Sequence, residues 1–364
     1  MGNDYLGQSV TLVNKNEFAT PRHRGLLIIP LILVTGGGLR IIMINNYDRF
    51  AADLPKAETI AFSSLEENEE VLLSCGVNQE MKQLGKGKFN SALASRRQGE
   101  AELYSDRFNV AVSMSLEPPA DTVAFLFPRT ASGCFLASGV DLGNEKLLVL
   151  PQGSATDIVG PALIGSDSIL IPTQRYHELV ERLCTSFEPI ESLHVVASEF
   201  VRHLKIRDAI PALISQPECS DDPEVFSQLL ALLISSFETS GDSQTTDKLT
   251  NPARTRVALQ TQEYIEQNFR QTFRMDEVCQ EVDAGLRTLQ RAFIEYFSIS
   301  VTQYLKLVRL NALHRDLRAA VPSEWTVAEL GTRNGFNHLG RLSVDFRKQF
   351  GKTPSETLQS GHRL

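Results

Sequence analysis

The sequence predicts an α+β fold, in which an antiparallel β-barrel with packed helices precedes an all-helical domain. Short, partly alternating apolar segments separated by Gly, Pro, Asp and Asn occupy residues 58–172, as they do in antiparallel sheets. From Thr173 onward the apolar residues recur at helical spacing instead. Near the C-terminus a pair of short helices joined by a tight turn occurs twice, 53 residues apart. The change of period therefore divides the chain into a β-rich part and a helical part.

Length and charge both indicate two domains with different surroundings. A chain of 364 residues is long enough for about two domains. Residues 251–364 contain 16 Lys and Arg against 12 Asp and Glu, a net charge of +4, while the rest of the chain carries −12. An acidic part beside a basic part is typical of a protein that contacts DNA with one end. The five scattered cysteines include no CxxC pair, which indicates reduced thiols rather than a disulfide framework.

Residues 1–57 are expected to be an extension that precedes the barrel. An apolar run, Gly25–Val34, follows Arg22 and Arg24, as in a secretion signal. Pro30 interrupts the run, which is shorter than the ~20 apolar residues that span a bilayer, so no transmembrane helix is expected. We expect that translation begins near Met43 and that the first 42 residues are not native; the intact mass of the protein made from its own gene would test this.

Residues 58–172 are expected to form the barrel, which is cupin-like in outline. Six segments have the length and composition of strands: residues 88–94, 101–104, 108–114, 122–127, 146–150 and 168–171. Turns rich in Gly, Pro, Asp and Asn separate them, at residues 85–87, 117–119, 142–144 and 151–153.

The predicted barrel lacks the residues of common metal-dependent enzymes. Cupin enzymes hold iron or manganese with histidines and a carboxylate, and this chain has no histidine between His23 and His177. The segment Gly85–Lys88 lacks the GxxxxGK[ST] spacing of a phosphate-binding loop. We therefore expect no catalytic residue, no metal and no cofactor. An oxygen-only ligand set and a scattered nucleophile–His–carboxylate set stay open as alternatives.

Residues 173–239 are expected to be helices packed on the barrel. Three apolar stripes at helical spacing favour this: Tyr176 to Phe187, Val195 to Leu204 and Phe226 to Phe237. The histidines of this region, His177, His194 and His203, do not have the spacing of metal ligands. Residues 240–250 are polar and predict a flexible linker before the helical domain at residues 251–364.

The clearest helix pair lies within Thr326–Pro354. Thr326 and Glu329 have the spacing of a capping box, and Asn334-Gly335 predicts the end of the first helix. Gly331 would let another helix approach closely, and Asn337 is expected to cap the second helix. One face of that second helix is apolar: Leu339, Leu342, Phe346 and Phe350.

An earlier copy of this pattern sets it apart from an ordinary helical hairpin. A first helix at Met275–Val282 precedes a stripe with the same spacing: Leu286, Leu289, Phe293 and Phe297. Thr302–Arg318 is expected to be one helix, about 25 Å long at ~1.5 Å per residue, that holds the two pairs apart. Two such pairs with basic outer faces predict helix-turn-helix units, in which the second helix enters the DNA major groove.

Three stretches of the helical domain match a known family: RTLQRAFIEYFSISVTQYL, RLNAL and TVAELGTRNGFNHLGRLSVDFRKQFGKTPSETL. Together they resemble the DNA-binding domain of AraC/XylS-type transcriptional regulators, over about residues 251–358. Asp283 stands where that family usually has a turn glycine, and Gly285 where a serine cap is usual; both residue types tolerate the geometry. A looser resemblance, carried by QLGKGKFNSALASRR and the strands after it, links residues 62–172 to the sensor domain of regulators of the ethanolamine-operon type.

The resemblance implies a cytoplasmic, sequence-specific DNA-binding transcription regulator and not an enzyme. It implies activation more often than repression, contact with RNA polymerase, and a small-molecule effector bound in the N-terminal domain. It also implies self-association through the helices of residues 173–239, and a homodimer would suit paired DNA half-sites. Two alternatives stay open: a constitutive DNA-binding regulator without a ligand, and a barrel enzyme tethered to DNA.

The expected DNA contacts lie on the outer face of the second helix of each unit. Arg287, Arg291 and Arg341 are the expected base readers, because arginine pairs bidentately with guanine. Arg347 and Lys348 are expected to meet phosphate. The remaining positions of the expected surface are Thr288, Gln290, Asn337, Gly340 and Val344. The family often has a polar or basic reader where this chain has Val344, so a thymine-methyl contact or mere backbone docking is the alternative at that position.

Overall fold

The computed structural model describes residues 29–35, 38–44, 54, 59–131, 134–143, 146–184, 189–190, 194–196, 206–215, 227–228, 230–231, 233–234 and 252–361. The chain divides into two compact units, Met1–Ala52 and Asp53–Leu364. In the first unit, β1 (Ile29–Thr35) and β2 (Gly38–Ile44) pair as an antiparallel hairpin with Ile29 opposite Ile44. The domain boundaries expected after residues 57, 239 and 250 fall outside the described residues and stay predictions.

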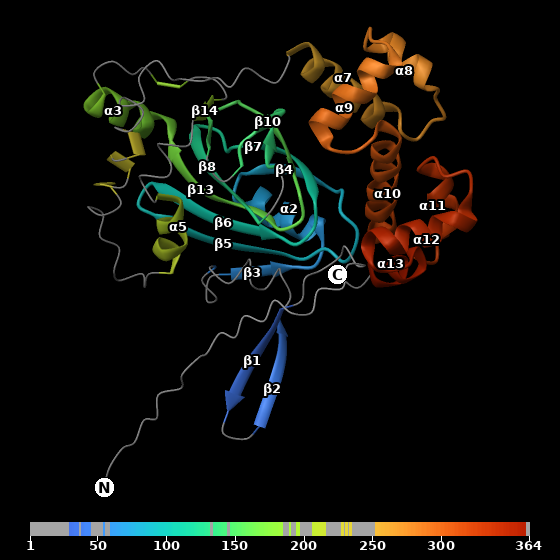
Figure 1. Cartoon of the computed structure of the whole chain (residues 1–364), viewed down its shortest axis with the longest axis horizontal. Helices are drawn as coiled ribbons and strands as arrows, with labels where there is room; N and C mark the ends of the chain where they lie inside the picture. The colour runs from blue at the N-terminus through green and yellow to red at the C-terminus, as the bar shows by residue number, and fades with distance from the viewer. Residues whose placement is uncertain are drawn as a thin grey trace, which may run out of the picture. The chain divides into compact units, whose positions relative to one another are not determined.

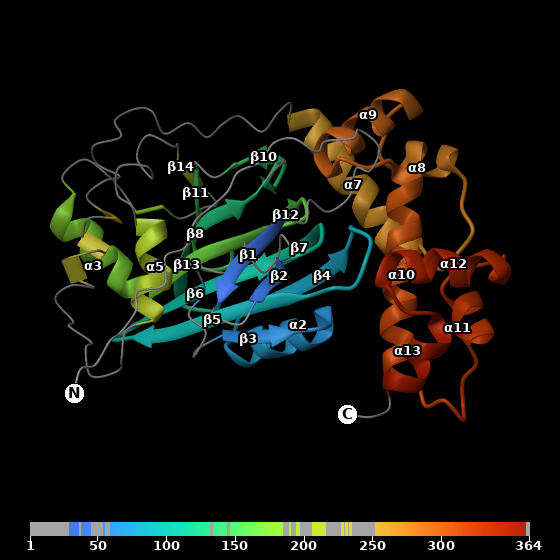
Figure 2. The same cartoon turned by 60° about the horizontal axis from the view of Figure 1, so that its bottom comes forward.

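Seven antiparallel strands of the second unit form its larger sheet, in the order β14-β11-β8-β13-β6-β5-β3 (Figure 1; β11 is labelled in Figure 2). Their bounds are β3 (Thr59–Phe62), β5 (Ser91–Gln98), β6 (Ala101–Phe108), β8 (Thr122–Thr130), β11 (Leu147–Leu150), β13 (Ile164–Pro172) and β14 (His194–Val196). In β13, Ser166 lies opposite Asp106 and Ser168 lies opposite Tyr104 of β6. Because side chains alternate along a strand, this register places all four on the same face of the sheet.

Five further strands form the smaller sheet, in the order β10-β9-β12-β7-β4. Their bounds are β4 (Asn78–Gln83), β7 (Val112–Glu117), β9 (Leu136–Ala137), β10 (Val140–Asp141) and β12 (Thr156–Gly160). One hydrophobic core takes residues from both sheets and from helix α2 (Leu65–Ser74), which contributes Leu65 and Leu72. The expected antiparallel, cupin-like β domain is confirmed.

A buried ion cluster joins the larger sheet to α5 (Ile206–Ile214). Arg107 Nη2 lies 3.1 Å from Asp167 Oδ1, and both side chains are fully buried. Arg129 pairs with the other oxygen of Asp167 and, at 3.2 Å, with Asp208 of α5. Because each charge of the cluster has an opposite charge within reach, burial is tolerated and α5 is fixed to this face.

Some elements differ from the sequence expectation. Val195 and Val196 were expected in a helix, but they lie in β14, which pairs antiparallel with β11. Pairing at a sheet edge and two β-branched side chains outweigh the helical period of the neighbouring residues there.

Strands β3, β4, β9, β10 and β12 were not expected either, and β4 (NQEMKQ) has one apolar residue in six. Helix α3 (Thr173–Leu183) does bury the expected Tyr176, Leu179 and Val180, while Phe187 and the stripe residues Phe200 to Leu204 lie outside the described residues.

In the helical domain one long helix joins two groups of shorter helices (Figure 2), and each group has its own hydrophobic core. Its elements are α7 (Pro252–Asn268), α8 (Met275–Glu281), α9 (Leu286–Phe297), α10 (Val301–Ala319), α11 (Val327–Arg333), α12 (Leu339–Phe350) and α13 (Pro354–Gly361). The first core joins α7, α8, α9 and the start of α10 and also includes Leu136 of β9 and Val159 of β12. The second core joins the end of α10 to α11, α12 and α13. Within the described ranges no helix is both long enough and apolar enough to cross a membrane.

Candidate DNA-binding surface and barrel cavity

The first helix-turn-helix unit consists of α8, a tight turn and α9. Asp283 in this turn has a φ of 46°, the left-handed region that the expected turn requires. Leu289, Phe293 and Phe297 are buried as expected. Leu286 is 42% exposed, so its assignment to the inner stripe is wrong. It is the first residue of α9 and lies beyond the end of the packed core.

All four residues of α9 that are expected to contact DNA are exposed: Arg287, Thr288, Gln290 and Arg291. Arg291 Nε donates a hydrogen bond to Glu295 Oε1 at 2.9 Å, and Arg254 Nη1 of α7 donates to the same carboxylate at 3.1 Å. The hydrogen bond from Arg291 holds the pKa of Glu295 below its usual value. The outer face of α9 therefore carries an acceptor as well as its arginines.

The second unit consists of α11, a turn and α12. Thr326 Oγ1 accepts a hydrogen bond from Glu329 N, and the Glu329 carboxylate accepts one from Thr326 N, so the expected capping box is confirmed. A Cβ atom added to Gly331 would lie 2.9 Å from the Cδ2 atoms of Leu339 and Leu342. Glycine at this position therefore allows α12 to pack directly on α11.

The start of α12 differs from the expectation. Gly335 in the turn has a φ of 79°, which glycine adopts freely. His338 is the residue that precedes α12, and it makes no side-chain capping hydrogen bond. The expectation that Asn337 caps α12 is therefore wrong, because the helix begins one residue later than a cap at Asn337 requires. Leu339 is 38% exposed and, like Leu286 in the first unit, does not belong to the inner stripe.

The residues of the second unit that are expected to contact DNA are also all exposed: Asn337, Gly340, Arg341, Val344, Arg347 and Lys348. The Arg341 side chain is 84% exposed, with Nε 3.8 Å from Asp345 Oδ2. Asp345 is held more closely by Lys306 of α10, at 2.7 Å. The exposed face of α12 thus combines a basic residue with an apolar one, Val344, which is 52% exposed.

One helix-turn-helix unit packs against each end of helix α10. At its start Tyr304 contacts Phe293 and Phe297 of α9, with both ring centroids 5.1 Å away. Near its end His314 lies over Phe350 of α12, with the centroids 4.6 Å apart. The helix is 19 residues long, or about 28 Å, against about 34 Å between successive turns of a major groove. The expected helix at 302–318 is confirmed to within one residue at each end.

A buried network of amides joins the helical domain to the edge strand β4. Gln83 N donates to Asn311 Oδ1 at 2.9 Å, and Asn311 Nδ2 donates to Gln83 O at 3.1 Å. Gln349 of α12 donates to the same carbonyl at 3.0 Å, and Gln83 Nε2 donates to Gln349 O at 2.8 Å. All three side chains are at most 3% exposed. Polar side chains of α10 and α12 therefore occupy hydrogen-bonding positions that a sixth strand would otherwise take.

Charged residues of α2 and α10 form a second set of contacts between the two domains. Glu69 Oε1 lies 2.8 Å from Arg315 Nη2, and Glu66 Oε1 lies 3.2 Å from His314 Nδ1. Arg318 pairs with Glu67 at 3.3 Å. Burial raises the pKa of Glu66, but hydrogen bonding and charge attraction from His314, with Arg318, outweigh it and lower that pKa to about 2. Helix α2 thus contributes both to the barrel core and to the contacts with α10.

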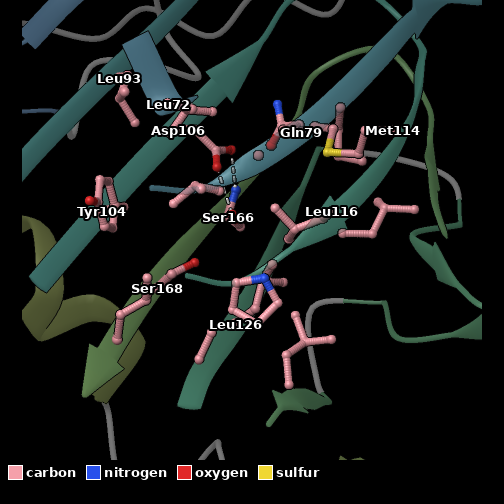
Figure 3. Close-up of a pocket in the computed structure, with 18 of the residues that line it drawn as sticks. Leu72, Gln79, Leu93, Tyr104, Asp106, Met114, Leu116, Leu126, Ser166 and Ser168 are labelled. Carbon is pink, nitrogen blue, oxygen red and sulfur yellow. Dashed lines mark hydrogen bonds between the residues drawn. The ribbon is translucent and has the colours of Figure 1, made fainter. Parts of the chain in front are cut away.

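A cavity lies between the two sheets, with an empty volume of about 670 Å³ that is partly open to solvent. Its walls are mostly aliphatic, and its polar side chains come mainly from β6 and β13 (Figure 3). Asp106 Oδ1 accepts a hydrogen bond from Ser166 N and Oδ2 accepts one from Ser166 Oγ, each at 2.7 Å. Burial raises the pKa of Asp106 to about 6. Leu72 of α2 also lines this cavity.

Sequence reasoning missed Asp106 and the amide network, although each left a signal. In Tyr104-Ser105-Asp106-Arg107-Phe108 a carboxylate occupies the inner face of an alternating strand. Asn311 and Gln349 interrupt apolar helix faces in the same way. Within the described part of the chain, no cluster of three or more His, Cys, Asp or Glu side chains is placed to hold a metal ion.

Comparison with known proteins identifies the helical domain. Residues 278–360 match a family model described as a helix-turn-helix domain. Over 109 residues the chain is 30% identical to the probable thc operon regulatory protein of Rhodococcus erythropolis, covering 30% of this chain and 32% of that protein. It is 27% identical over 143 residues to the transcriptional activator RhaS of Salmonella schwarzengrund, covering 39% of this chain and 47% of that protein.

A solved structure is also similar to part of the chain. It is that of a probable AraC family transcriptional regulator from Rhodopseudomonas palustris, 31% identical, covering 29% of this chain and 96% of that one, with a TM-score of 0.27. The chain spans about a third to a half of the curated relatives described above. The family-model match lies within the domain in which the two helix-turn-helix units were expected and are found. The C-terminal domain is therefore a helix-turn-helix domain similar to those of AraC/XylS-type transcriptional regulators.

Proposed function

We propose that this protein is a transcription regulator that binds promoter DNA with both helix-turn-helix units. The observation that carries the proposal is the arrangement of α9 and α12 at opposite ends of α10, each with its polar outer face exposed. A rigid spacer of about 28 Å suits two readers in successive major grooves on one side of the duplex. The family is one of transcription factors and not of enzymes, which favours this function over a barrel enzyme tethered to DNA.

In this proposal the residues of the two outer faces divide between base and phosphate contacts. Arg287, Arg291 and Arg341 read bases, since each is exposed at the outer face of its helix. Arg347 and Lys348, in the last turn of α12, neutralise phosphates. The smaller contacts come from Thr288, Gln290, Asn337, Gly340 and Val344.

The Glu295 carboxylate sets a condition on DNA binding by α9. It holds Arg291 at 2.9 Å in the free protein, so Arg291 must exchange this partner for a base or share it. A carboxylate on the reading face also disfavours nearby phosphate and can accept a hydrogen bond from cytosine N4. The ion pair therefore supplies selectivity rather than affinity.

We further propose that a small molecule in the barrel cavity controls DNA binding. Helix α2 links the two places, because Leu72 lines the cavity while Glu66, Glu67 and Glu69 pair with α10. A ligand that moves Leu72 would change those ion pairs and, through α10, the placement of both units. We also propose that the protein is a cytoplasmic homodimer and that it activates transcription by contact with RNA polymerase. RhaS and the XylDLEGF operon protein of Pseudomonas putida are named transcriptional activators.

The test is binding of the full chain to DNA fragments from upstream of its own and neighbouring genes, at two salt concentrations. Arg291→Ala should reduce affinity for the best fragment by roughly 5- to 150-fold, as expected for loss of a base contact of ~1–3 kcal/mol. Arg97→Ala serves as the control, because Arg97 is an exposed arginine of β5 in the barrel. Binding that is equal for all fragments and equally affected by both substitutions would contradict the proposal.

A further inference from the structure

We propose that the barrel cavity takes an uncharged or positively charged small molecule with an apolar body and a hydrogen-bond-donating head group, and that Asp106 receives the donor. The inference rests on the proposed effector role of the cavity and adds the chemical class of the effector. It stands on the charge, the hydrogen-bonding capacity and the shape of the cavity wall.

The charge of the wall excludes anions. Among the described residues that line the cavity, Asp106 is the one ionisable carboxylate, and none is Lys, Arg or His. The neighbouring Arg107 is directed elsewhere: its Nη1 donates to the backbone oxygens of Asp106 and Ser166, and its Nη2 pairs with Asp167. A carboxylate or phosphate in the cavity would face the partly buried Asp106 carboxylate, and none of the described lining residues is a cation that offsets their repulsion, which is unfavourable among mostly apolar side chains.

The hydrogen-bonding groups of the wall call for a ligand donor. Each Asp106 oxygen accepts one hydrogen bond from Ser166 and keeps further acceptor capacity. The wall also contains an unpaired donor, because Gln79 Nε2 is buried and has no hydrogen-bond partner in the described structure. Gln79 and Asp106 both line the cavity (Figure 3). A primary amide or an alcohol, which both donates and accepts, would satisfy both kinds of group, and an amine would satisfy Asp106.

The remaining wall fits a hydrocarbon or aromatic body. Leu72, Met114, Leu116 and Leu126 are among its apolar residues, and they come from a helix and both sheets (Figure 3). The empty volume of about 670 Å³ includes open solvent, and the part of it that water-sized molecules can occupy is about 60 Å³. Because part of this space is open to solvent, a body of one ring is the appropriate size for a first probe.

The experiment compares probes that share one body and differ in the head group. Full-length protein is titrated with 2-phenylacetamide, 2-phenylethylamine and phenylacetate, with calorimetry and the melting temperature as readouts. The amide and the amine should bind at least tenfold more tightly than phenylacetate. Asp106→Asn should remove most of the preference for the amine over phenylacetate, whereas Asp276→Asn, an exposed carboxylate of α8, should leave it unchanged.

Phenylacetate binding as tightly as the amide, or no binding by any of the three probes, would overturn the inference. If Asp106→Asn does not fold, the order of the three probes on the unmodified protein decides alone. Promoter binding measured on the same preparation keeps the two proposals apart. Retained specific DNA binding together with the wrong order of probes refutes the ligand class only, while the right order without DNA binding refutes the regulator.

Discussion

Gln83 and Asn311 pair through two hydrogen bonds, between the backbone N–H and C=O of Gln83 and the side-chain amide of Asn311. One side chain of α10 thus binds the edge of β4 in the manner of a neighbouring strand. Because the backbone groups of an edge strand otherwise need water or another chain, this pair fixes the position of α10 on the barrel.

Replacing Asn311 by Ala should destabilise the protein. The Gln83 carbonyl would keep the hydrogen bond from Gln349, but the Gln83 N–H would remain buried without an acceptor, at a cost of about 1–3 kcal/mol. Urea unfolding measures the loss. Gln303→Ala, at an exposed position of the same helix, should change the free energy of unfolding by less than about 0.5 kcal/mol. Equal effects of the two substitutions would show that the amide pair contributes nothing.

Glu66 should stabilise the protein in a way that disappears in acid. Its folded pKa of about 2 lies below its ordinary value of 4.5, so its contribution is fully present above pH 4.5 and is lost as the pH falls toward 2. Glu66→Gln should therefore lower the free energy of unfolding at pH 7 by about 1–3 kcal/mol, and the difference from the unmodified protein should shrink between pH 4.5 and pH 2. A difference that does not depend on pH in this window would contradict the ion pair with His314 and Arg318.

Asp106 should show the opposite dependence. Its folded pKa of about 6 lies above its ordinary value of 3.8, so the folded state binds the proton more tightly than the unfolded state. Its ionisation therefore costs stability increasingly as the pH rises from 3.8 to 6, and the full cost of about 1–3 kcal/mol is present above pH 6. Urea unfolding of Asp106→Asn should lack this decline, while Asp276→Asn should retain it. Parallel pH profiles for Asp106→Asn and the unmodified protein would refute the assignment.

Two glycines of the second unit should respond differently to the same substitution. Gly331→Ala places a Cβ atom 2.9 Å from Leu339 and Leu342, so it should cost about 1–3 kcal/mol and weaken DNA binding through misplacement of α12. Gly340→Ala meets no atom within 4 Å and should instead stabilise α12 by up to about 1 kcal/mol. Thermal unfolding and DNA binding of both variants check this. Similar destabilisation by both would contradict the close packing of α11 on α12.

The sequence was sufficient to predict the helices of the helical domain, because the patterns that specify them are local. The capping box of Thr326 and Glu329 and the buried spacing of Leu342, Phe346 and Phe350 depend on residues within one short segment. Even there, Leu286 and Leu339 were assigned inward, because the period alone does not show where a packed core ends.

The β domain and the cavity depend on pairing between distant segments, which local patterns do not specify. Strand β4 is held by its register with β7 and by contacts with α10 and α12, more than 200 residues away, so its polar sequence gave no sign of a strand. Asp106 likewise becomes part of a hydrogen-bonded site only because β13 pairs with β6 and places Ser166 opposite it. The DNA contacts proposed from the sequence are all exposed, but which bases they read depends on the DNA.

Helix α10 also restricts how this protein can diverge in evolution. Since it is one unbroken helix with a unit anchored at each end, a single inserted residue would rotate α12 by about 100° around the axis relative to α9 and shift it by ~1.5 Å. The two reading faces would then no longer point to the same side of the duplex. Only insertions or deletions near whole turns, such as seven residues for two turns, preserve that alignment. Descendants of this protein can therefore change the bases they read one residue at a time, whereas the spacing between the two half-sites can change only in steps.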